Sequence, residues 1–279
     1  MDRYLVSVIG VAAWGGALWL IVGLRSTRRA APSRDPDDGP GARLASATGR
    51  VAGMAAGGLV AGVLVLGFGG RLLMRVLAAT SPDSAQGRLT EAEEVVGAVT
   101  MGGTVALVLF VGVFGGVAGL VLYGVLRRWL PDRSLVAGLV TAGIGAGLLA
   151  VPSGLVDPEN RDFTILDPVW LAVALCLGLI VTFALLGAVL MDRWAASWPT
   201  PDASVAGIAG LLPFIPLLLL PPVAVGTAGA IAWCAARPTS SAPGSRRRAT
   251  DTVVRSVALA AGCAGGAWTL ASASQILTA

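Results

Sequence analysis

Two arginines stand inside a mostly apolar stretch, "FGGRLLMRVLAATSPD", at positions 71 and 75. A spacing of four places Arg71 and Arg75 on one face of a helix. A guanidinium near hydrocarbon is costly, so such residues mark candidate functional sites. If the helix enters the bilayer near Arg50, about 20 residues carry it across the hydrocarbon, so both arginines lie at the far rim.

Three roles remain open for this pair. The arginines can extend to lipid phosphates, or they can form structural ion pairs with the acidic loop "VDPENRDFTILDP". They can also line an outward-facing anion pocket, together with hydroxyls of the next helix at the same height, estimated from a rise of about 1.5 Å per residue. The candidate site residues are Arg71, Arg75, Thr100, Thr104, Asp157, Glu159 and Asp162.

Other polar residues have sufficient structural roles. Thr90 and Glu93 in "LTEAEEVVG" have the spacing of a capping box, so they predict a helix start there. Asp167, followed by Pro168, predicts a second start with Asp167 as the N-cap. We therefore assign Thr90, Glu93 and Asp167 to helix capping.

Several kinds of chemistry are excluded by residue types that the chain lacks. All 20 basic residues are arginines and there is no histidine. Imidazole bases, histidine-ligated metals and lysine Schiff bases are therefore impossible. The three cysteines lie far apart within apolar runs, as small buried hydrophobes do. We expect no catalytic residues, no metal and no cofactor, and an enzyme is the less favoured class.

The composition indicates an all-α polytopic membrane protein with one transmembrane domain over 1–279. Only 13% of the residues are charged, about half the share in soluble domains. The proline-broken stretch 204–236 is interpreted as two short segments around Pro221 and Pro222; a single kinked helix is the alternative, giving seven segments instead of eight. The eight apolar segments are 5–24, 51–80, 95–126, 135–152, 169–191, 204–220, 223–236 and 253–277.

Arginine distribution orients these segments. With eight crossings, 15 arginines fall on one side and 5 on the other, so the arginine-rich side is predicted to be cytoplasmic and both termini outside. The polar stretches 25–50 and 237–252 become flexible cytoplasmic loops. This basic face suits anionic lipid headgroups. The juxtamembrane arginines are not interleaved with aromatics, so nucleic acid is not an expected partner.

Glycines recur at a spacing of four along several segments, which allows helices to approach closely in lipid. Such faces either pack within one chain or form a homo-oligomer. The pairs are Gly53 and Gly57, Gly58 and Gly62, Gly112 and Gly116, Gly143 and Gly147, and Gly262 and Gly266.

The blocks "GGRLLMRVLAATSPDSAQGRLTEAEEVVGAVTMGGT" and "DPENRDFTILDPVWLAVALC" resemble uncharacterised multi-pass membrane proteins of actinobacteria over about residues 66–192. The resemblance implies a bacterial plasma-membrane location and supplies no activity. The leading hypothesis is a non-enzymatic accessory or scaffold protein with an outward-facing polar patch. The alternatives are a small-solute or lipid transporter that uses 204–236 as its moving element, and a lipid-active enzyme.

Overall fold

The computed structural model describes residues 39–90, 95–98, 100–150, 156–202, 204–215, 228 and 245–278. Over these residues the chain is all-α, apart from loops and an isolated β-bridge between Leu89 and Val95. The long elements are α2 (Pro40–Ala61), η1 (Gly62–Gly69), α3 (Gly70–Thr80), α4 (Met101–Ala106), η3 (Leu107–Val113), α5 (Phe114–Leu126), α6 (Ser134–Gly145), η4 (Ala146–Ala150), α8 (Val169–Ser197) and α12 (Ser245–Thr278).

Within the described residues, four helices are long and apolar enough to cross a membrane: Pro40–Thr80, Met101–Leu126, Val169–Ser197 and Thr252–Thr278. Ser134–Leu148 is a shorter apolar helix. Five of the eight predicted segments are therefore helices, and segment 5–24 lies outside the described residues. The start of the sixth segment, 204–220, differs from prediction, since α9 (Val205–Ala209) ends in turns at 210–213 instead of continuing. Apart from residue 228, the seventh segment, 223–236, lies outside the described residues.

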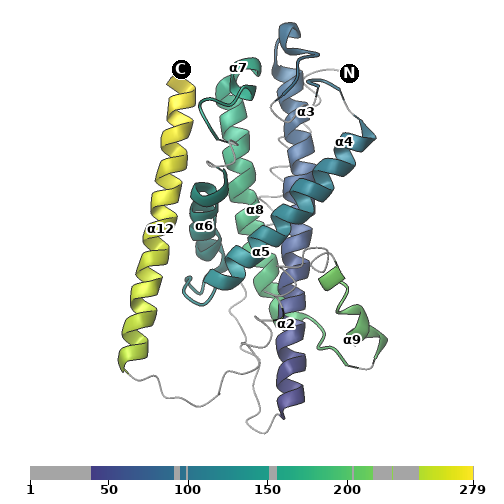
Figure 1. The fold of residues 1–279 in the computed structure, drawn as a ribbon, viewed down its shortest axis with the longest axis vertical. Helices are drawn as coiled ribbons and strands as arrows, with labels where there is room; N and C mark the ends of the chain where they lie inside the picture. The colour runs from purple at the N-terminus through teal and green to yellow at the C-terminus, as the bar shows by residue number, and fades with distance from the viewer. Residues whose placement is uncertain are drawn as a thin grey trace.

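The five described helices alternate in direction (Figure 1). We call the end where α3 and α12 finish the Arg71 end, and the opposite end the Arg127 end. α8 finishes and α12 starts at the Arg127 end. A chain that leaves and returns at one end fits the two-segment interpretation of 204–236, although most of that stretch lies outside the described residues.

Three helix starts differ from the sequence prediction. α2 starts at Pro40, so residues 40–50 of the predicted flexible loop are helical; proline at the first turn loses no helical hydrogen bond. Likewise, residues 245–252 of the second predicted loop belong to α12. The third apolar run becomes helical only at Met101, because residues 95–98 form a bridge and a turn with Gly97 at φ +85°.

Glycines set the closest helix contacts, and they do so within the chain. Gly53 and Gly57 lie against the backbone of α8, and a Cβ at Gly62 would lie 2.2 Å from the carbonyl oxygen of Gly112. A Cβ at Gly143 would meet the carbonyl oxygen of Gly262 at 2.1 Å. The spacing-four glycines thus serve packing inside one bundle. Homo-oligomerisation through these faces remains an untested prediction.

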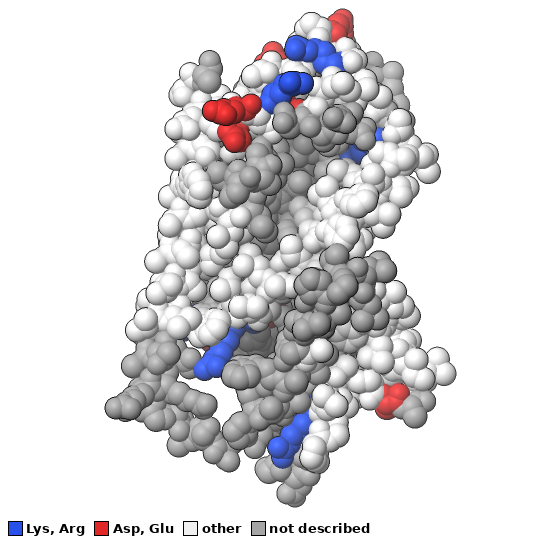
Figure 2. Space-filling view, in the orientation of Figure 1, with Lys and Arg blue, Asp and Glu red and all other residues white. Residues whose placement is uncertain are grey.

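Charged side chains gather at the two ends of the bundle, and an uncharged belt separates them (Figure 2). Large apolar side chains are exposed along this belt, including Phe110, 65% exposed, and Leu270, 63% exposed. A soluble protein would hide such a surface, whereas hydrocarbon solvates it. The surface therefore supports a membrane location.

A candidate anion site at the Arg71 end

A cavity of about 460 Å³ opens at the Arg71 end of the bundle. Its walls come from α3, the loop 86–98, the segment 160–166 and the start of α8. Most of the lining is apolar, and Leu73, Leu77 and Phe163 are typical of it. Among the described residues, the charged lining side chains are Arg71, Arg75 and Asp162, so this described part of the lining has two positive charges and one negative charge.

The guanidinium of Arg71 has weak hydrogen-bond partners for its N–H groups. Its Nε is buried and has no hydrogen-bond partner among the described residues. Its Nη2 donates to the carbonyl oxygen of Thr100 at a long 3.4 Å, and Nη1 lies 4.0 Å from the Met74 sulfur. A guanidinium has five N–H donors, and good N–H···O bonds are about 2.9 Å long. The group therefore retains donor capacity for an anion.

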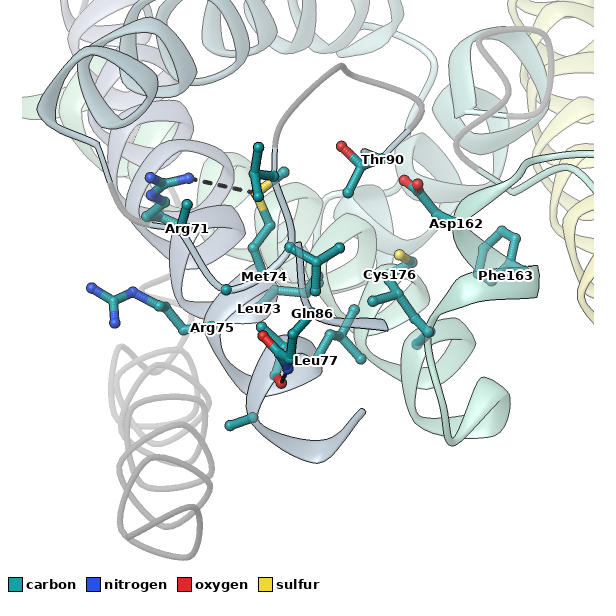
Figure 3. Close-up of a pocket in the computed structure, with 18 of the residues that line it drawn as sticks. Arg71, Leu73, Met74, Arg75, Leu77, Gln86, Thr90, Asp162, Phe163 and Cys176 are labelled. Carbon is teal, nitrogen blue, oxygen red and sulfur yellow. Dashed lines mark hydrogen bonds between the residues drawn. The ribbon is translucent and has the colours of Figure 1, made fainter. Parts of the chain in front are cut away.

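Arg75 lies one turn further along α3 and is exposed. Figure 3 shows both arginines at one edge of the cavity, with Asp162 beside Cys176 on the opposite wall. Like charges four residues apart on a helix repel, costing a few tenths of a kcal/mol. An anion between the two guanidinium groups would remove that repulsion.

The acidic loop does not neutralise these arginines. Among the described residues, no ion pair joins Arg71 or Arg75 to Asp157, Glu159 or Asp162. Instead, Oδ1 of Asp157 accepts a hydrogen bond from the backbone amide of Glu159, at 2.9 Å. Asp162 starts the short helix α7 (Asp162–Ile165), and its amide donates to Asn160. The loop thus organises its own turns, and the structural ion-pair alternative loses its geometric support.

Thr100 lies within reach of Arg71, neither Thr100 nor Thr104 is among the described lining residues of the cavity, and both hydroxyls bond the backbone at the start of α4. Thr100 is the N-cap of α4, and its Oγ1 accepts a hydrogen bond from the amide of Gly103, at 3.0 Å. Oγ1 of Thr104 donates to the carbonyl oxygen of Thr100, at 2.9 Å. Thr100 therefore meets Arg71 through its carbonyl oxygen and not through a hydroxyl.

Two of the capping assignments require correction. Thr90 is not a helix N-cap, because the chain pairs Leu89 with Val95 and α4 begins only at Met101; Glu93 lies outside the described residues. Asp167 is displaced by one position, since Pro168 is the N-cap of α8.

The physical reason for the second correction is hydrogen bonding. The carbonyl oxygen of Pro168 accepts the first helical bond, from Leu171 at 3.0 Å. The carbonyl oxygen of Asp167 instead accepts a bond from the Ser81 hydroxyl, at 3.2 Å.

The Arg127 end holds a buried ion pair that the sequence did not lead us to single out. The guanidinium of Arg127 forms two parallel bonds to Asp192, 2.8 Å from Nε to Oδ1 and 2.9 Å from Nη2 to Oδ2. Both side chains are about nine-tenths buried. Nη1 of Arg127 also donates to the carbonyl oxygen of Pro131, and the Ser134 hydroxyl donates to Asp192 at 2.6 Å.

This ion pair is fully satisfied, unlike Arg71. Burial alone would lower the pKa of Arg127, but the hydrogen bond and the attraction from Asp192 outweigh burial and raise the pKa. The pair fastens the α5–α6 connection to α8 and leaves little capacity for a ligand. The sequence does contain one indication of this ion pair. Arg127 and Asp192 each directly follow an apolar segment, 95–126 and 169–191, that is predicted to end on the same side of the membrane.

No protein-family model, no curated protein and no solved structure matches this chain. The resemblance to actinobacterial membrane proteins therefore stays a prediction. Within the described ranges, no three cysteine or acidic side chains are grouped to hold a metal ion.

Proposed function

We propose that this chain is a non-enzymatic, multi-pass accessory protein of a bacterial plasma membrane that binds an anionic group in the cavity at its Arg71 end. The under-satisfied guanidinium of Arg71, beside Arg75, carries this proposal. Arginine suits phosphate and carboxylate because its planar fork donates two hydrogen bonds at once. The apolar belt and the four long apolar helices support the membrane setting.

A charge-removing variant tests the binding role. We expect Arg71→Gln to weaken binding of phosphatidic acid by about tenfold, because a charge-assisted hydrogen-bond donor is worth about 1.5 kcal/mol or more. The measurement is native mass spectrometry of the full chain, delipidated in detergent and titrated with phosphatidic acid.

The matched control is Arg88→Gln, which removes an equal charge at the same end from an exposed residue outside the cavity lining. Equal affinities for the two variants would show that Arg71 does not hold the anion. An unchanged unfolding temperature for Arg71→Gln separates lost binding from lost folding.

The proposed orientation places the Arg71 end outside the cell. It is supported by the arginine excess at the other end and by the placement of the α12 terminus (Figure 1). In a variant whose three cysteines are replaced by alanine, we expect Ser84→Cys to react with an impermeant maleimide in intact cells. Ser197→Cys, exposed at the Arg127 end, should react only after lysis. Labelling in the reverse pattern would invert the proposed topology.

The transporter alternative depends on Pro221 and Pro222, which lie outside the described residues. The lipid-active enzyme gains no support from the described lining, where the carboxylate of Asp162 lies across the cavity from the arginines and no second carboxylate stands beside it. Binding without catalysis is therefore the role that the described geometry favours.

A further inference from the structure

A second cavity, of about 370 Å³, lies between α5, α6 and α8, midway along the bundle. Its lining is almost wholly apolar, and Gly115, Gly119 and Gly145 remove side chains from its walls. Among the described residues, Tyr123 and Thr141 supply its hydroxyl groups, and the hydroxyl of Thr141 donates a hydrogen bond to the carbonyl oxygen of Ala137. We call this cavity the apolar groove. Its mouth includes the exposed side chains of Phe110 and Ala118, so it opens to hydrocarbon.

The groove and the cavity at the Arg71 end share one face of α8. Ala172 and Cys176 line the cavity, and Ile180 and Ala184 line the groove. These four residues are spaced by four and therefore form one ridge along the helix. Between the two hollows, Cys176 and Ile180 are partly buried and pack against the apolar core, so apolar side chains occupy the ridge from one hollow to the other.

The helix formed by η1 and α3 also lines both hollows. Leu73 of α3 lines the cavity, and Leu66 of η1, about two turns away, lines the groove. Along α8, the midpoint of the cavity pair and the midpoint of the groove pair are about eight residues apart. At a rise of about 1.5 Å per residue, this separation is about 12 Å. A charged hollow at the rim is thus followed, toward the middle of the bundle, by an apolar one.

A charged cavity followed by an apolar groove matches a molecule with a charged head group and a hydrocarbon chain. Building on the proposed anion site, we propose that the two hollows bind a single phosphate-bearing amphiphile from the surrounding leaflet. Its phosphate lies at Arg71 and Arg75, and one hydrocarbon chain follows the α8 ridge into the apolar groove. A free phosphate would use the arginines alone and leave the apolar walls of both hollows bare. The chain of a leaflet lipid is already in hydrocarbon, so the groove contributes van der Waals packing against its walls and not transfer from water.

The experiment fills the groove without touching the arginines. Ala118→Phe places a phenyl ring at an exposed position of the groove mouth, and Val121→Phe places the same side chain at an exposed position of α5 outside it. Full-length protein is placed in phosphatidylcholine nanodiscs containing phosphatidic acid with a photoreactive diazirine in the middle of one chain. Cross-linked peptides are then mapped, and affinity is measured with phosphatidic acid and with chainless glycerol 3-phosphate.

We expect cross-links in α5, α6 and α8 at the groove. We expect at least about tenfold weaker lipid binding in Ala118→Phe, no change in Val121→Phe, and no competition by glycerol 3-phosphate at concentrations where the lipid saturates. Two results overturn the inference: competition by the chainless ester at equal concentration, or equal affinities for the two phenylalanine variants. If Arg71→Gln still weakens binding in that case, the proposed anion site stands without its chain. If it does not, both proposals fail.

Discussion

Replacing Asp192 with asparagine should cost about 3–5 kcal/mol of folding free energy, the largest effect expected from a single substitution in this chain. The reason is the state of Arg127, whose guanidinium is about nine-tenths buried and forms two of its hydrogen bonds to Asp192. With the carboxylate gone, a buried positive charge would lack compensation. The measurement is thermal or denaturant unfolding of the full chain in detergent.

The matched control for this variant is Arg193→Gln, which removes a charge from the adjacent, exposed position of α8. A surface change of this kind should alter stability by no more than about 0.5 kcal/mol. The double variant Arg127→Met with Asp192→Leu should be more stable than Asp192→Asn, because no charge stays buried alone. Equal stabilities for Asp192→Asn and Arg193→Gln would refute the structural role of the pair.

Adding one methyl group at Gly62 should destabilise the bundle by about 3 kcal/mol, the upper part of the usual range for overpacking. A Cβ there would lie 2.2 Å from the carbonyl oxygen of Gly112 and 2.6 Å from the Cα of Gly116. Both neighbours are backbone atoms, so relief requires a shift of the whole helix formed by η3 and α5. The gain of about 1 kcal/mol in helix propensity from glycine to alanine does not offset that shift.

Gly102→Ala is the control, since a Cβ at Gly102 would meet no atom within 4 Å. It should leave the apparent unfolding temperature unchanged or raise it slightly, because only the propensity gain remains. Both variants make the same chemical change, so a difference between their unfolding temperatures reflects the packing around each glycine. If Gly62→Ala unfolds at the same temperature as Gly102→Ala, the close crossing of η1 and η3 does not exist in the membrane.

The two polar centres of the bundle differ in a way that explains their proposed roles. Arg127 meets a carboxylate and a nearby carbonyl oxygen at 2.8–2.9 Å, so its donors are occupied by the protein. Arg71 meets a carbonyl oxygen at 3.4 Å and leaves Nε without a partner among the described residues. An arginine satisfied by its own chain stabilises the fold, whereas one left open is available to a ligand.

Much of the architecture was determined locally and was therefore visible in the sequence. Long apolar runs become helices because hydrocarbon leaves no other partner for backbone groups. Helix rise alone placed Arg71 level with about residue 105 and Arg75 with about 101, and Arg71 in fact reaches Thr100, a few residues nearer the start of α4 than estimated. Local patterns located helix ends less well. A capping box at Thr90 and an N-cap at Asp167 were plausible, but α4 begins only at Met101 with Thr100 as its N-cap, and the carbonyl oxygen of Asp167 accepts a bond from Ser81.

The sequence by itself determined that this chain is an apolar helical bundle with charged ends, and that two arginines stand at one rim. Only the tertiary structure decided which arginine is satisfied. Arg127 and Asp192 are 65 residues apart, and their meeting depends on how α5 and α8 rotate and cross. The close approach of these two helices is seen at Gly119 of α5, where a Cβ would lie 2.6 Å from Cζ of Phe183 of α8. Hydrophobicity acts on each segment separately, whereas the partner of a buried charge is set by the packing of all of them.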